Sequence, residues 1–299
     1  MENLIEVPTI TSSAMLVEVN IKCWTARVKD KRASEEVTQR NNADKKTATV
    51  TKKLLGDCVE LDQLEKYSKR SRNASYERTL PWTDGGDRLL TTEQMFDFTQ
   101  QMSEWEQGFY KLVDVFDQRY PFLMTQAQAS LGTLFNPSDY PHPDDIRGKF
   151  RFRVIYKPIA ESDDFRVDIG VEGNRMLATQ YEDHYDEQIQ KAMGNLWERM
   201  NTCLTNMSSK LSEPEDTDNQ TKTGSKTFRN TLFTNTHHML DMMKTCNITG
   251  DSRMEAIRRS IEDSLHGITP DAVRQDSRLR AETKRAMDDA IAQIPTLDM

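Results

Sequence analysis

An apolar stripe between Thr92 and Tyr120 restricts the fold of this chain more than any other feature. Its apolar residues recur at spacings of three and four, the period of one helix face. They are Met95, Phe98, Met102, Trp105, Phe109, Leu112, Phe116 and Tyr120. A second stripe, from Ala178 to Leu211, predicts a helix of roughly nine turns. Helices of this length are typical of bundle or coiled-coil packing. Further helices are predicted at 54–78, 227–246, 252–266 and 270–294.

Two segments alternate apolar and polar residues, which is the pattern of a half-buried strand. The first covers residues 16–24, and the second covers 150–170 as two short runs separated by a polar turn, which predicts a hairpin. Together they predict an antiparallel sheet of about three strands with one apolar face. The other face would carry Lys22, Trp24, Arg151, Arg153, Lys157 and Arg166. The predicted fold class is therefore α+β, mostly helical, with long helices packed on a small antiparallel sheet, and not an OB fold.

The stretch T-L-P-W-T-D-G-G-D-R-L-L, residues 79–90, predicts a rigid corner. Pro81 disfavours a helical conformation at the preceding residue, so a helix should end before it. The Asp84-Gly85-Gly86 run indicates a turn, and Thr91 with Gln94 predicts a capping box for the next helix. Two interpretations remain open for the side chains of the corner. Either Trp82 fills a core pocket while Arg88 bridges Asp84 or Asp87, or Trp82 and Arg88 face a ligand.

The predicted organisation is one continuous domain with two regions. A basic N-terminal region, 1–90, contains a strand and a helix that ends at the corner, and 91–299 is a helical region with the inserted hairpin. Residues 30–50 are polar and predict a mobile loop or a marginal helix. Residues 212–225 contain almost no apolar side chain, so a flexible loop is expected there.

Charge is distributed unevenly along the chain. The formal net charge is −8, but residues 21–78 carry 15 Lys and Arg against 9 Asp and Glu, a net +6. Residues 79–299 carry 25 against 36, a net −11. Such asymmetry indicates a polyanionic partner for the basic part.

Features of catalysis or metal binding are weak. The chain contains no Walker loop, no G-x-G-x-x-G and no G-x-S-x-G. His237, His238 and Asp241 place two kinds of ligand one helical turn apart, which is too few for a metal site without a further ligand. Four widely spaced cysteines predict reduced thiols. No apolar run is long enough to predict a membrane span. We therefore expect no enzymatic activity, no metal, no cofactor and no membrane.

Cations interleaved with aromatic residues favour nucleic-acid binding. Single strands are held by a positive groove and by aromatic faces on which bases stack. The predicted nucleic-acid-binding residues are Lys22, Trp24, Arg27, Lys45, Lys46, Lys52, Lys53, Arg70, Arg72, Arg78, Arg88, Arg151, Arg153, Lys157 and Arg166.

Three segments carry a family resemblance: T-L-P-W-T-D-G-G-D-R-L-L, G-T-L-F-N-P-S-D-Y-P and D-F-R-V-D-I-G. With them the chain resembles a family of phage and bacterial proteins, and within it the Drc-type cofactors of podoviruses that carry a virion RNA polymerase. The resemblance implies a single-stranded-DNA-binding protein that helps to recruit a phage RNA polymerase to promoter DNA in the host cytoplasm. The alternative is a non-catalytic scaffold that binds a partner such as an AAA+ ATPase. A homo-oligomer is compatible with either function.

Overall fold

The computed structural model describes residues 10–44, 46–160, 170–212 and 230–295. The chain forms two compact units. Unit 1 comprises residues 1–18, 78–96 and 156–299, and unit 2 comprises 19–77 and 97–155. This division differs from the predicted boundary at residue 90. Periodicity assigns a segment to a helix or a strand but not to a core, so it gives no sign that one element contributes to two units.

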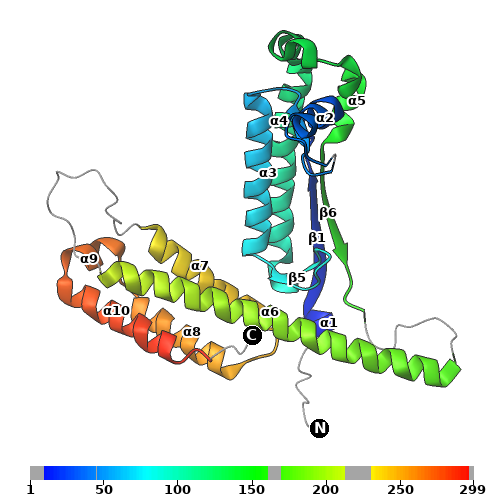
Figure 1. The fold of residues 1–299 in the computed structure, drawn as a ribbon. Helices are drawn as coiled ribbons and strands as arrows, with labels where there is room; N and C mark the ends of the chain where they lie inside the picture. Colours follow the sequence, from blue (N-terminus) through cyan, green and yellow to red (C-terminus); the bar gives the residue numbers. More distant parts are fainter. Residues whose placement is uncertain (1–9, 45, 161–169, 213–229, 296–299) are drawn as a thin grey trace. The chain divides into compact units, whose positions relative to one another are not determined.

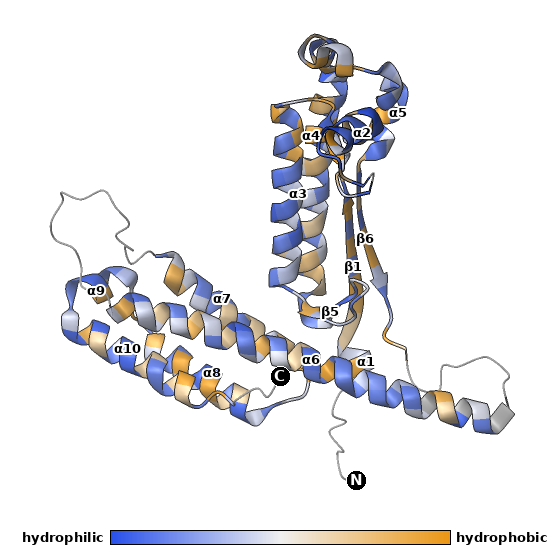
Figure 2. Cartoon of the chain, in the orientation of Figure 1, coloured by the Kyte–Doolittle hydropathy of each residue, from blue (hydrophilic) through white to orange (hydrophobic). Residues whose placement is uncertain are grey.

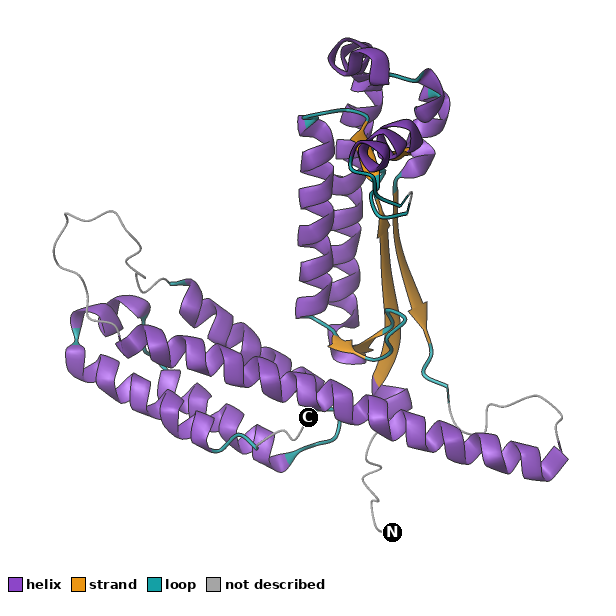
Figure 3. Cartoon of the chain, viewed as in Figure 1, coloured by secondary structure: helices purple, strands orange, loops and turns teal. Residues whose placement is uncertain are grey.

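The helix-rich α+β architecture is confirmed (Figure 3). The predicted helices are α3 (Val59–Glu77), α4 (Met95–Leu131), α6 (Gly170–Ser212), α7 (Thr231–Cys246) and α8 (Ser252–Leu265). The helix predicted at 270–294 is instead two helices, α9 (Pro270–Gln275) and α10 (Ser277–Ala292). They separate at Asp276, whose backbone is extended and whose carboxylate accepts hydrogen bonds from the amides of Arg278 and Leu279. A capping aspartate at this position begins a new helix.

Residues 30–50 were predicted as a mobile loop or a marginal helix. The structure instead places a helix there, between two paired strands. Helix α2 (Lys31–Arg40) lies between strands β2 (Arg27–Asp30) and β3 (Val50–Lys53), which pair antiparallel. The remaining short elements are α1 (Ile10–Ser13), α5 (Pro143–Ile146), η1 (Thr92–Gln94), η2 (Gly132–Leu134), η3 (Pro137–Asp139) and η4 (Arg147–Lys149).

The main sheet has four strands in the order β4-β5-β1-β6. Strands β1 (Ala14–Lys22) and β6 (Arg151–Lys157) are the predicted ones, while β4 (Leu80–Pro81) and β5 (Arg88–Thr91) come from the corner. The second strand predicted in the 150–170 hairpin begins at Phe165 and lies outside the described residues, as does nearly all of the predicted 212–225 loop.

The corner is a β-hairpin. Helix α3 ends at Glu77, before Pro81 as predicted, and Gly86 turns the chain with a φ of 102°, a conformation that glycine adopts without steric cost. The predicted capping box is wrong. Thr91 ends β5 with its side chain buried and makes no capping hydrogen bond, while the side-chain Nε2 of Gln94 donates to Oγ1 of Thr245.

The core of unit 2 lies between helix α4, helix α3 and the sheet (Figure 1). Phe109, Phe116 and Tyr120 are fully buried, which confirms the predicted stripe in this part of α4, whereas its first residue, Met95, is 39% exposed. The ring of Phe109 lies 5.7 Å from that of Phe152, and the ring of Phe116 lies 5.3 Å from that of Phe150. The visible parts of α4 carry both polar and apolar positions in the hydropathy colouring (Figure 2). One face of β6 therefore packs against the aromatic stripe of α4.

The backbone of α4 at Gly108 lies against the side chain of Tyr67 on α3. A Cβ atom at this position would lie 1.9 Å from Oη of Tyr67 and 2.7 Å from its Cζ. The Tyr67 ring cannot move freely because it packs edge-on against Trp105, with ring centroids 4.8 Å apart. We expect Gly108→Ala to lower the free energy of unfolding by about 1–2 kcal/mol, because overpacking exceeds the gain of about 1 kcal/mol in helix propensity.

Urea denaturation measures this change, and Gly194→Ala on α6 is the matched control. A Cβ at Gly194 meets no atom within 4 Å, so the control should be neutral or stabilising. A Gly108→Ala variant as stable as its Gly194→Ala counterpart would show that α3 and α4 separate without cost.

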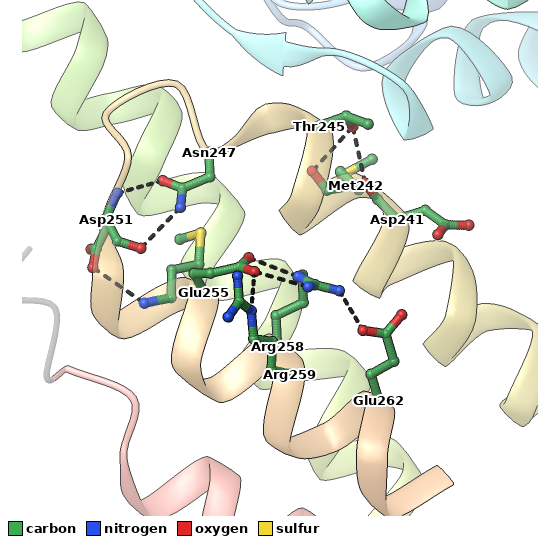
Figure 4. Close-up of polar contacts among 10 residues, drawn as sticks. Asp241, Met242, Thr245, Asn247, Asp251, Glu255, Arg258, Arg259 and Glu262 are labelled. Atoms are coloured by element: carbon green, nitrogen blue, oxygen red, sulfur yellow. Dashed lines mark hydrogen bonds and ion pairs between the residues drawn. The ribbon is translucent and has the colours of Figure 1, made fainter. Parts of the chain in front are cut away.

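Unit 1 is a bundle in which α6, α7, α8 and α10 pack together (Figure 1). Its core contains the fully buried Leu196, Met200 and Met207 of α6. On α8, the buried Arg258 donates to both Glu255 and Glu262, and Arg259 donates to Glu255 (Figure 4). The hydrogen bonds from Arg258 lower the pKa of Glu255 to about 2. This network satisfies a guanidinium that would otherwise be buried at high cost.

Within the described residues, no helix is long and apolar enough to cross a membrane. The described parts of the chain also contain no group of three His, Cys, Asp or Glu side chains placed to hold a metal ion. Cys23, Cys58, Cys203 and Cys246 are free thiols, and burial raises the pKa of each.

Candidate nucleic-acid interface

The solvent face of strands β1 and β6 can be identified from one contact. Nζ of Lys157 lies 2.8 Å from Oε2 of Glu18, so these two side chains share a face of the sheet. Because side chains alternate along a strand, Lys22 of β1 and Arg153 of β6 lie on that face too. Arg151 follows by the same alternation, and the intervening Phe152 is buried in the core.

Lys22, Arg151 and Arg153 form what we call the sheet cations. All three side chains are exposed, and none has an ion-pair or hydrogen-bond partner among the residues that the structure describes. The predicted basic face is thus present at these positions. Lys157 differs, since its ammonium group contacts both Glu18 and Asp87 at 2.8 Å, and these hydrogen bonds raise its pKa. Its charge is balanced within the protein.

A second set of cations lies on the β2–β3 hairpin. Arg27 pairs with Lys53 across the two strands, and Lys29 pairs with Thr51 on the same face. Like charges directly opposite each other destabilise a strand pair. The side chains of Arg27, Lys29 and Lys53 are exposed and have no carboxylate partner within the described ranges. We call these three the hairpin cations, and their uncompensated repulsion would be relieved by an anionic ligand.

Lys52, a predicted binding residue, points to the other face of the hairpin. Its side chain is only 8% exposed, and its Nζ lies 2.7 Å from Oδ2 of Asp139 and 3.9 Å from Oδ2 of Asp30. It also donates to the carbonyl oxygen of Leu134 at 2.7 Å. Lys52 therefore holds the 133–139 segment against the hairpin and offers no unbalanced charge to a ligand.

Trp24, predicted beside the sheet cations, packs against the core of unit 2. Its ring meets those of Phe116 and Tyr120 edge-on, with centroids 6.3 and 5.7 Å away. The predicted strand covered residues 16–24, but β1 ends at Lys22. The alternation that placed Trp24 on the solvent face therefore does not extend to it.

The remaining predicted residues belong to neither of these two sets. Arg70 and Lys46 are exposed, while Arg72 donates to the carbonyl oxygen of Ile21 at 3.2 Å. Arg78 and Arg88 belong to unit 1. Lys45 and Arg166 lie outside the described residues.

The corner side chains serve the core of unit 1. Trp82 is 5% exposed, and its ring meets that of Tyr185 edge-on at 5.6 Å. Arg88 donates to Oγ1 of Thr79 at 2.6 Å and to its carbonyl oxygen at 2.8 Å. Asp84 is paired with Lys191, and Asp87 with Lys157. The interpretation of Trp82 as a core residue is confirmed, and the guanidinium of Arg88 bonds to the backbone and hydroxyl of Thr79.

The two units differ in the sign of their charge. Unit 2 contains 20 Lys and Arg against 17 Asp and Glu, a net +3, whereas unit 1 contains 20 against 31, a net −11. Lys29 was the member of the hairpin cations that the sequence prediction omitted, although the alternation Arg27-Val28-Lys29 was a signal for it.

No protein-family model, curated protein or solved structure matches this chain.

Proposed function

We propose that this chain binds single-stranded DNA through the sheet cations and the hairpin cations of unit 2. The observation that supports the proposal is six exposed lysines and arginines without carboxylate partners among the described residues, carried on strands of one unit. Strands hold such groups at a fixed spacing, so less side-chain and backbone freedom is lost when phosphates bind. Neutralising phosphates releases counterions, which is the main source of affinity for a nucleic-acid backbone.

The resemblance to the Drc-type cofactors favours a single strand and a transcriptional role. In this proposal, unit 2 holds one strand of opened promoter DNA, and the acidic surface of unit 1, with its net −11, contacts the phage RNA polymerase. Complementary charge steers such protein–protein encounters and selects partners. The protein would act in the host cytoplasm, without catalysis of its own.

The test is a salt titration of oligo-dT binding by the triple variant Lys22→Ser, Arg151→Ser, Arg153→Ser. Each phosphate neutralised on a single strand contributes about −0.7 to the slope of log K against log salt. Removing the three sheet cations should therefore flatten the slope by about 2 units. A duplex of equal length should bind more weakly than the oligo-dT to the unchanged protein.

The matched control removes three other cations of unit 2, Lys66, Lys69 and Lys111. They are equally exposed and have no partner in the described structure, but they lie on α3 and α4. This control makes the same change in net charge and should leave the slope almost unaltered. Equal losses in both triple variants would indicate a diffuse field and not a site, and absence of oligo-dT binding at low salt would refute the proposed function.

A further inference from the structure

Unit 2 contains a pocket whose lining residues, apart from Lys29, lie outside the sheet cations and the hairpin cations. It has a volume of about 370 Å³ and opens between the hairpin, the start of α2 and the 133–139 segment. This volume is at the lower end of the range for small-molecule sites, roughly 300–1,000 Å³. The pocket lies wholly within unit 2 and shares Lys29 with the hairpin cations.

One side of the pocket is cationic. Lys29 and Lys31 are exposed and have no ion-pair partner among the described residues. Three carboxylates line the pocket, and each is already engaged: Oδ1 of Asp30 accepts from the amide of Ala33 at 3.0 Å, Glu36 is paired with Arg32, and Asp139 is paired with Lys52. The positive charge at the rim is therefore available to an anion, although the pocket also contains acids.

The 133–139 segment lines the rest of the pocket with two apolar residues, Leu134 and Phe135, and the amide group of Asn136, beside the polar Thr133 and Asp139. Leu134 is 50% exposed, and its carbonyl oxygen accepts a hydrogen bond from Nζ of Lys52, which fixes the backbone at this position. The adjacent Phe135 ring packs against Tyr140 at 5.2 Å. Oδ1 of Asn136 accepts from the amide and hydroxyl of Ser138, at 3.1 and 2.9 Å. These two bonds fix the amide orientation and leave its Nδ2 group to donate to a ligand.

We propose that this pocket binds a single nucleotide. Its phosphate lies between Lys29 and Lys31, its base lies against Leu134 and Phe135, and the Asn136 amide donates to an acceptor on the base edge. The three parts of the pocket match the three chemical parts of this ligand: an anion, an apolar face and a polar edge. The nucleotide is either free or part of a bound strand, and only the second case rests on the proposed function.

The test uses the full chain and isothermal titration calorimetry with dTMP, thymidine, inorganic phosphate and oligo-dT. We expect dTMP to bind more tightly than thymidine or phosphate, because only dTMP engages both sides of the pocket. Lys31→Gln should weaken dTMP binding about tenfold, the size of one lost charge-assisted hydrogen bond. Leu134→Ser should weaken it severalfold. Lys66→Gln, an exposed lysine of α3 without a described partner, should change nothing.

The outcomes separate the two sources of nucleotide. If dTMP binds and both pocket variants weaken it, the ligand is a free nucleotide, and this holds even where oligo-dT does not bind. If only oligo-dT binds, and the pocket variants weaken it more than Lys66→Gln does, the ligand is a nucleotide within a strand. Equal affinity for dTMP and thymidine, or affinities for dTMP and oligo-dT that neither pocket variant alters, would overturn the proposal.

Discussion

Replacing Trp82 by alanine should lower the free energy of unfolding by about 3–5 kcal/mol, the cost of removing a large aromatic side chain from a core. The indole is 5% exposed and belongs to the same core cluster as Leu196 and Met200 of α6. The variant also loses the edge-on contact between the Trp82 and Tyr185 rings. Trp82 directly follows the two-residue strand β4, and its backbone amide donates to the carbonyl oxygen of Asp87 at 3.2 Å. Urea denaturation followed by circular dichroism measures the change.

Phe96→Ala is the matched aromatic control for this variant. Phe96 is 78% exposed, and its removal should alter stability by less than about 0.5 kcal/mol. If Trp82 were a stacking platform for bases, Trp82→Ala would leave stability unchanged and reduce the affinity for oligo-dT. That pattern would contradict the position of the indole in the core.

The long helices could be predicted because their apolar pattern persists over many turns. Phe98, Met102 and Phe109 continue a stripe that no strand or loop reproduces, and all three are buried. The β2–β3 hairpin could not be predicted in the same way. Each of its strands has four residues, too few for a period to emerge, and β2 contains a single apolar residue, Val28. The polar helix between the strands has no apolar stripe of its own and is held by the hairpin.

The candidate site was predictable in charge but not in pairing. Lys52 and Lys53 are neighbours in the sequence, yet one is buried against Asp139 and the other is exposed opposite Arg27. Asp139 is remote in the sequence, so only the fold reveals that it neutralises Lys52. Lys157 is a similar case, because Glu18 reaches it from β1 and Asp87 from the turn before β5. A list of basic residues therefore predicts the region of a candidate interface but overestimates how many of its cations are free of a carboxylate partner.

Tyr120 should make the protein sensitive to alkaline pH. Its side chain is fully buried, its hydroxyl donates to the carbonyl oxygen of Pro141 at 3.0 Å, and burial raises its pKa to about 12. The unfolded chain loses this proton near the ordinary tyrosine pKa of about 10. Between these values the unfolded state is deprotonated and the native state is not, so stability falls as pH rises. The raised pKa contributes stability below about pH 10 that is mostly lost by about pH 12, a fall of roughly 2 kcal/mol.

The variant Tyr120→Phe isolates this contribution because it keeps the ring and removes the ionisable group. At about pH 8 the variant should be less stable than the unchanged protein by about 0.5–1.5 kcal/mol, the net value of one hydrogen bond. As pH rises, the unchanged protein loses the linked stability and the variant does not. The order of stability should therefore invert between about pH 10 and pH 11. Urea unfolding midpoints across this range measure both proteins. A difference that stays constant with pH would mean that Tyr120 ionises in the native state as readily as in the unfolded chain, and that water reaches the centre of the unit 2 core.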